Sequence, residues 1–315
     1  MSPTLLGMEI GGTKLQVVSG DSLGHIIERW RCQVDPSKGG QGIREQIGTV
    51  LGKVLEQVPH PQAMGVGFGG PVNRQTGMIE CSHQIEGWSG FDIAGWVRSI
   101  TGIQNVRVDN DANVAALGEA LLGAGHGHDP VFYVTLGSGV GGGLVEGLRI
   151  YHGARPGEAE VGHLRLDRNG TTVESRCSGW AVDQKIRAMK RSAPQGLLSR
   201  LTANLSSGEA RFLAQACEGG DPDALRILNE TVGDLAFGLS HVVHLFHPEV
   251  IVVGGGLSLV GEPLRAALEN AIPAFVMEAF KPAPLVRLAA LGEDAVTSGA
   301  LLLAQAHLSG SQKPL

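Results

Sequence analysis

The stretch DNDAN, at residues 109–113, joins a predicted buried strand to a predicted helix over 112–122. Asn110 and Asp111 therefore fall at the carboxyl end of a strand, where a side chain can face a ligand while the backbone behind it stays rigid. The alternative is that Asp109 or Asp111 only caps the helix. One aspartate is enough for a cap, so the pair leaves a carboxylate for chemistry.

A glutamate and a histidine have the spacing Glu-x-x-His in GEAEVGH, residues 157–163. Glu160 and His163 can accept from and donate to neighbouring hydroxyl groups, so we interpret them as contacts for a polyol. A surface pair is the alternative. Catalytic zinc needs three protein ligands, and no third ligand is evident nearby. Glu174 comes just before another predicted helix. The residues around it say little, so a solvated side chain is the default expectation.

Glycine-rich turns occur twice, in EIGGTK at residues 9–14 and in LGSGVGGG at residues 136–143. Each is the first strand-to-strand turn of a predicted unit. Glycines there let backbone N–H groups converge on an anion, and a polyphosphate would suit two such turns on opposite walls of one cleft. Two ordinary hairpins are the alternative.

Two matches to the dinucleotide motif G-x-G-x-x-G, at residues 65–70 and 137–142, are rejected. That motif needs a helix at the turn, and the residues that follow both matches lack helical periodicity. The stretch VVGGGLSLVG, residues 252–261, does run from a strand into a predicted helix. We interpret it as a loop that approaches a nucleotide base or ribose.

The elements that must position these residues form two topologically similar halves, each of β-β-β-α-β type. In the first half, strands are predicted at 5–10, 14–19, 25–34 and 63–68, with an apolar helical stripe between Ile43 and Val58. In the second half, strands are predicted at 131–136, 143–147, 148–153, 249–255 and 284–291, with helices in 179–246, one of them over 221–246, another after 255, and a closing helix over 294–307. The fold class is therefore α/β.

Composition excludes several classes of protein. The 315 residues carry a formal net charge of −6 with no basic block, and 4% are aromatic, so nucleic-acid binding is not expected. No signal peptide and no apolar run long enough for a membrane span is found. Four scattered cysteines without a CxxC pair indicate reduced, buried thiols in a cytoplasmic protein.

Six motifs, in order along most of the chain, resemble those of the ROK family (repressors, open reading frames and sugar kinases) in the actin-like ATPase superfamily. EIGGTK and LGSGVGGG resemble its two phosphate motifs, GVGFGGPVNRQTGMI its sugar-side loop, DNDAN its catalytic junction, GEAEVGH its sugar motif and VVGGGLS its adenosine motif. The chain is identified as a member on these motifs together. The resemblance implies a two-domain, ribonuclease H-like fold whose β-β-β-α-β units flank an interdomain cleft.

The resemblance further implies an ATP-dependent hexokinase-type reaction with MgATP, most simply on glucose or a related hexose. Asp111 would be the general base for the sugar hydroxyl. The sugar would contact Gly70, Asn110, Glu160, His163 and Glu174. The nucleotide would contact Glu9, Gly11, Gly12, Thr13, Lys14, Gly137, Ser138, Gly139, Gly254, Gly255 and Gly256.

Glu9 is one departure, because the family has Asp there. The extra methylene moves the carboxylate, which can disturb Mg²⁺ or phosphate geometry. A sugar or nucleotide sensor without efficient transfer is therefore the main alternative. An enzyme that uses polyphosphate instead of ATP is a second one, and the adenosine-like motif speaks against it.

A missing zinc loop is the other departure. Many members carry C-x-C-G-x-x-G-C after the sugar histidine, whereas here His163 is followed within eleven residues by Glu174 and no such cysteine set. No zinc is therefore expected. Only eight residues precede Glu9, so the DNA-binding branch of the family is not expected either.

The expected domains are a small one over 1–112 and a large one over 113–296, with the helix over 297–311 packed back on the small domain. By resemblance alone we expect a homodimer. The sequence does not identify the sugar; His83 or Gln84 in SHQIEGW, which departs from the expected Asn-containing stretch, could bear on that choice.

Overall fold

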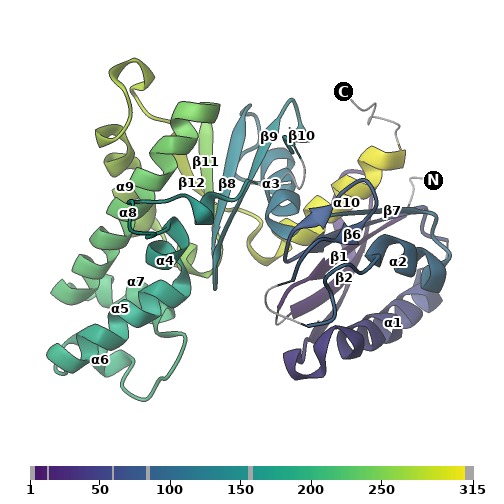
Figure 1. Cartoon of the computed structure of the whole chain (residues 1–315), viewed down its shortest axis with the longest axis horizontal. Coiled ribbons are helices and arrows are strands. Elements are labelled where there is room, and N and C mark those ends of the chain that lie inside the picture. Colours follow the sequence, from purple (N-terminus) through teal and green to yellow (C-terminus); the bar gives the residue numbers. More distant parts are fainter. Residues whose placement is uncertain (1–3, 13, 59, 83–85, 155–158, 309–315) are drawn as a thin grey trace. The chain divides into compact units, whose positions relative to one another are not determined.

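The computed structural model describes residues 4–12, 14–58, 60–82, 86–154 and 159–308. The chain groups into two compact units (Figure 1). The first consists of Met1–His126, Gly143–Glu158 and Glu293–Leu315, and the second of Gly127–Gly142 and Ala159–Gly292. The domain limits predicted from the sequence stay a prediction.

The first unit contains a five-stranded sheet with the order β3-β2-β1-β4-β7. Its strands are β1 (Leu5–Ile10), β2 (Lys14–Gly20), β3 (Ile26–Gln33), β4 (Ala63–Phe68) and β7 (Asn105–Asn110). β2 is antiparallel to β1 and β3, whereas β4 is parallel to β1 and β7. The four strands predicted for this half are confirmed, with limits that differ by at most one residue. A two-residue hairpin, β5 (Val72–Asn73) with β6 (Met78–Ile79), follows β4.

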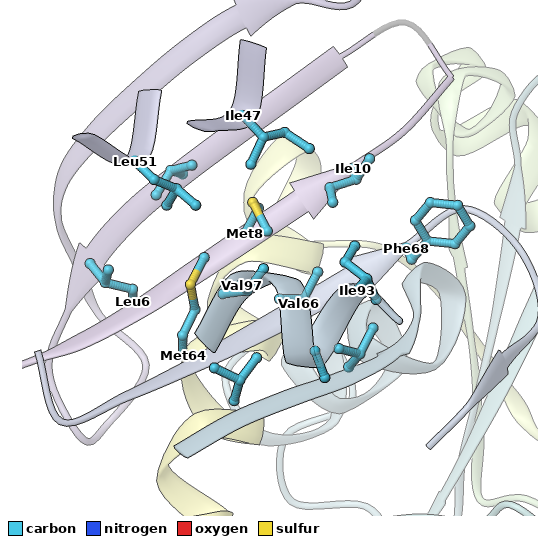
Figure 2. Close-up of a cluster of buried hydrophobic side chains, with 14 of the residues drawn as sticks. Leu6, Met8, Ile10, Ile47, Leu51, Met64, Val66, Phe68, Ile93 and Val97 are labelled. Atoms are coloured by element: carbon cyan, nitrogen blue, oxygen red, sulfur yellow. The ribbon is translucent and has the colours of Figure 1, made fainter. Parts of the chain in front are cut away.

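One face of this sheet is covered by α1 (Gly39–Gln57) and α2 (Ile93–Thr101) (Figure 2). The apolar stripe of α1 recurs at the 3- and 4-residue spacing of a helix, so all its members point to one side. Figure 2 shows the meeting side chains Leu6, Met8, Ile10, Met64, Val66 and Phe68 of the sheet and Ile47, Leu51, Ile93 and Val97 of the helices. Burying each large side chain stabilises the fold by about 2 kcal/mol, so this core holds the strands whose ends form the site.

Alternate residues of the same strands point to the opposite face. There Leu5 and Ala63 pack with Leu301 of α10 (Ala295–Leu308). Val114 of α3 (Asp111–Leu121) packs with Ala300 of α10. The sheet of the first unit is therefore covered on both faces, as a sheet with parallel strands must be.

The second sheet has the order β10-β9-β8-β11-β12. Its strands are β8 (Val131–Leu136), β9 (Val140–Glu146), β10 (Arg149–Ile150), β11 (Val250–Gly254) and β12 (Leu285–Leu288). β11 is parallel to β8 and β12, and β10 is antiparallel to β9. Counted within each sheet, both orders read third, second, first, fourth, fifth strand, so the predicted similarity of the two halves is confirmed.

The second unit carries most of the helices, drawn from teal to green in Figure 1. They are α4 (Val173–Cys177), α5 (Gly179–Ser192), α6 (Leu197–Leu201), α7 (Leu213–Glu218), α8 (Pro222–Phe246) and α9 (Glu262–Ala271). α8 matches the predicted long helix; Asp221 caps it and proline is its first residue. None of the helices formed by described residues combines the length and the apolar character that a membrane span needs.

Candidate active site

The carboxyl ends of three parallel strands lie side by side in the first unit. Ile10 pairs with Phe68, and Phe68 pairs with Asn110, so β1, β4 and β7 end in register. The residues that follow these ends therefore gather at one edge of the sheet, where open α/β sheets bind ligands. The residues after β1 belong to the predicted first phosphate turn, those after β4 to the sugar-side loop, and those after β7 to the catalytic junction.

Gly69 is the point at which these three segments meet. Its N–H donates to the carbonyl of Ile10 at 3.0 Å. A Cβ on Gly69 would lie 3.3 Å from Asp111 Oδ2, 3.5 Å from the Ile10 carbonyl and 3.9 Å from Gly11 Cα. The structure thus brings the carboxylate of Asp111 close to the beginning of the first glycine turn, with only a glycine between them.

Asn110 is the cap of α3. Its Oδ1 accepts from the N–H groups of Ala112 and Asn113 at 2.9 and 3.3 Å, and its Nδ2 donates to the carbonyl of Gly70 at 3.2 Å. The sequence alternative that Asp109 or Asp111 caps the helix is therefore wrong. Neither carboxylate is used as the cap.

Asp109 lies in a buried network that the sequence analysis did not find. Its Oδ1 accepts from Asn113 Nδ2 at 3.0 Å, and its Oδ2 lies 2.6 Å from His152 Nε2. His152 is 43 residues away along the chain. Its neighbours in LRIYHG carry no motif, so only the tertiary fold reveals the pair.

Glu9 is held at the end of β1 by two donors from β2. Gln16 Nε2 donates to Glu9 Oε2 at 2.8 Å, and Lys14 Nζ lies 3.3 Å from the same oxygen. Gln16 is fully buried, and its own Oε1 accepts from Arg31 Nε at 2.6 Å. The longer carboxylate at this position is therefore fixed by its cross-strand partner. Thr13 lies outside the described residues.

The second glycine turn joins β8 to β9 in the second unit. Gly137 donates to the carbonyl of Gly139 at 3.0 Å, and its own carbonyl accepts from the N–H of Gly179, the first residue of α5, at 2.7 Å. Ser138, at the tip, is exposed. The turn is thus fixed at its base and open at its tip, as an anion-binding turn requires.

Glu174 lies against this turn. Its Oε2 accepts from the N–H of Val140 at 2.9 Å, and a Cβ on Gly139 would lie 2.4 Å from that oxygen. The expected helix after Glu174 begins earlier, because Thr172 and Ser175 form a capping box that places Glu174 inside α4. Glu174 is therefore a partly buried residue with a backbone partner.

Glu160 and His163 lie at η2 (Val161–His163), 4.0 Å apart between Oε2 and Nε2, with side chains 47% and 75% exposed. The carbonyl of Leu164 accepts from the N–H of Val173 at 3.0 Å. His163 precedes Leu164 and Glu174 follows Val173, so this hydrogen bond brings His163 and Glu174 near one another. Gly157 and Glu158 of the same motif lie outside the described residues, as do His83 and Gln84.

The predicted adenosine motif packs on the end of β8. Gly255 has a φ of 80°, and a Cβ there would lie 2.6 Å from backbone atoms of Leu136. A side chain is therefore excluded at Gly255 by both conformation and space. Leu136 leads directly into the second glycine turn, so two of the predicted nucleotide motifs are neighbours within the second unit. The expected helix after Gly255 is delayed: η4 (Gly256–Val260) comes first, and α9 starts at Glu262.

Cysteines do not form a metal site in the described part of the chain, where no group of three or more His, Cys, Asp or Glu residues could hold an ion. Cys177 is buried, and its Sγ lies 3.6 Å from the carbonyl of Thr231. Burial raises the pKa of the Cys177 thiol to about 12, which makes it unreactive. The expectation of no zinc stays a prediction.

Two five-stranded sheets of the same strand order, each with a glycine turn after its first strand, define an α/β protein of the two-domain actin-like ATPase fold. The sequence profile of the ROK family matches residues 5–307, and the chain belongs to this family. The recognition made from six short motifs is confirmed.

Similar proteins cover nearly the whole chain. A glucokinase of Thermotoga maritima is 28% identical over 97% of this chain and 98% of its own length. A glucokinase of Streptomyces coelicolor is 31% identical over 95% and 97%. The crystal structure of a ROK family glucokinase from Streptomyces griseus in complex with glucose and AMPPNP is 29% identical, with a TM-score of 0.84 over 96% of this chain and 99% of that one.

Proposed function

We propose that this protein transfers the γ-phosphoryl group of ATP to a hydroxyl of a hexose, with Asp111 as the general base. The similar glucokinases support a carbohydrate kinase in general. The observation that carries the proposal is the convergence of Asp111 Oδ2, Gly11 and the Ile10 carbonyl around Gly69. This arrangement puts a proton acceptor beside a turn suited to phosphates.

Phosphoryl transfer depends on positioning and charge neutralisation, with little covalent chemistry for the protein. Asp111 would take the proton of the sugar hydroxyl as that oxygen attacks the γ-phosphorus and the bond to the ADP oxygen breaks. Gly11, Gly12, Thr13 and Lys14 would hold phosphates in the first unit. Gly137–Gly139 would do so in the second, with Gly254–Gly256 at the adenosine.

Magnesium accompanies ATP in this chemistry, and Glu9 would hold it together with the phosphates. An oxygen donor suits Mg²⁺, and the carboxylate of Glu9 is only 15% exposed and fixed by Gln16 and Lys14. The ion would neutralise charge on the phosphates. Asn110, Gly70, Glu160, His163 and Glu174 would orient the sugar.

A coupled assay of ADP release across a panel of hexoses tests this function. Turnover of one hexose with ATP is the expected result. Calorimetric binding of a sugar without turnover of any would instead favour a sensor, the alternative that Glu9 motivates. Turnover with polyphosphate but not with ATP would favour the other donor.

Replacing Gln16 by Leu tests whether Glu9 is held for the nucleotide. A hydrogen bond to a charged group contributes about 1.5–3 kcal/mol, so losing it should raise the KM for ATP by roughly tenfold. The KM for the sugar should stay within about twofold. Gln46→Leu is the control, because Gln46 also donates from Nε2, to the Gln33 carbonyl at 2.6 Å, elsewhere in the first unit. An unchanged KM for ATP in the Gln16 variant would contradict the role of Glu9.

Metal analysis of the purified protein tests the zinc prediction. We expect less than about 0.1 equivalent of zinc after dialysis, because a structural zinc site has four ligands and the described residues form no group of even three. One tightly bound equivalent would refute it.

We also propose, on the resemblance, that the protein acts in the cytoplasm as a homodimer without nucleic-acid or membrane partners. Light scattering of the purified chain tests the dimer.

A further inference from the structure

His152 and Asp109 form a largely buried pair directly behind the catalytic junction. The side chains are 13% and 5% exposed, and His152 Nε2 lies 2.6 Å from Asp109 Oδ2. A carboxylate only accepts, so Nε2 carries the proton of this hydrogen bond. A hydrogen bond to an ionised, buried acceptor is short and strong.

The other oxygen of Asp109 accepts from one residue before Asp111 and one residue after it. Asp109 Oδ1 accepts from the N–H of Asn110 at 2.8 Å and from Nδ2 of the fully buried Asn113 at 3.0 Å. One contact fixes the last residue of β7, and the other fixes the first turn of α3. The Asp109 carboxylate therefore links residues 110 and 113 and so fixes the segment that contains Asp111.

We propose that His152 is a positioning residue for Asp111, acting through Asp109; this rests on the proposed function. A buried carboxylate that loses a partner is strongly destabilised and must reorient toward another donor or water. Reorientation of Asp109 would release Asn110 and Asn113, and Asp111 would shift with them. A displacement of about 1 Å at a catalytic group can cost on the order of 10²-fold in rate.

The first test compares His152→Leu with His152→Gln. We expect kcat to fall about 10- to 100-fold in the Leu variant, with the KM for ATP within about twofold, because the base is displaced while the nucleotide-binding residues stay. The Gln variant, which keeps an N–H donor, should return to within about threefold of the original kcat. His128→Leu is the control: His128 also faces a carboxylate, Glu249 Oε2 at 3.5 Å, away from the junction. A kcat within twofold in His152→Leu would overturn the proposal.

The second test is hydrogen exchange, which needs no turnover. His152→Leu should speed exchange in peptides covering 105–121 while α1 stays unchanged. A separate kinetic comparison asks whether His152 acts through Asp109: if it does, Asp109→Asn/His152→Leu should lose no more kcat than His152→Leu alone. Faster exchange throughout the first unit would show general destabilisation, and a lower kcat in the double variant than in His152→Leu would show that the two residues act separately; either result would overturn the proposal. If the unaltered protein phosphorylates no hexose, the proposed function fails, and local exchange alone decides whether His152 positions the junction.

Discussion

We expect Asp111→Asn to abolish turnover: kcat should fall at least about 10³-fold, whereas the sugar Kd should change less than about threefold. General base catalysis contributes roughly 10²- to 10⁴-fold, and an amide of the same shape cannot accept the proton. The cap of α3 is unaffected, because Asn110 supplies it. Single-turnover kinetics and sugar calorimetry measure the two quantities separately.

The matched control for this change is Asp223→Asn. Asp223 is also an acidic residue in the first turn of a helix, α8, so it shares the helix-dipole contribution of Asp111 without its site. We expect its kcat to stay within about twofold. Activity retained by Asp111→Asn, or lost equally in the control, would show that the base is another residue.

Local sequence signals were sufficient for the strands and for the edge at which the site lies. Period-two and continuous apolar runs bounded by glycine located β1, β4 and β8 to within a residue, because burial of both sheet faces leaves few alternatives. The parallel order then puts Gly11, Gly69 and Asp111 at one edge without any further information. The network behind Asp111 could not be predicted, since the partner of Asp109 comes from a segment far along the chain.

Two features of the structure that the sequence analysis did not predict, the Glu9–Gln16 contact and the late start of α9, are nevertheless marked in the sequence. Glu9 and Gln16 are direct cross-strand neighbours, and a hairpin closed at Gly11–Lys14 puts those two residues opposite one another. The delayed start of α9 is marked by Pro263, which favours the first turn of a helix. The capping role of Asn110 was missed because Asp and Asn are nearly equivalent caps, so composition alone does not choose among three neighbouring candidates.

α10 approaches its neighbours in the first unit through glycines. A Cβ on Gly65 would lie 1.9 Å from the Ala300 carbonyl, and one on Gly118 would lie 2.5 Å from the Ala295 carbonyl. A Cβ on Gly299, within α10 itself, would lie 1.9 Å from the Val114 carbonyl of α3. These are contacts with backbone, which cannot rotate away as a side chain can. α3, the helix that begins at Asp111, is therefore positioned by close packing against α10.

Gly299→Ala should destabilise the first unit by about 3 kcal/mol. Overpacking costs typically 1–3 kcal/mol, and here the added methyl group meets a carbonyl, so the upper end is expected despite a gain of about 1 kcal/mol in helix propensity. Gly52→Ala is the control, because Gly52 is exposed in α1 and a Cβ there would meet nothing within 4 Å; it should stabilise by about 0.5–1 kcal/mol. Urea unfolding followed by tryptophan fluorescence measures both, since Trp30, Trp88 and Trp96 all lie in the first unit. If Gly299→Ala were as stabilising as Gly52→Ala, helix propensity would be the only effect, and α3 would owe its position to something other than its contact with α10.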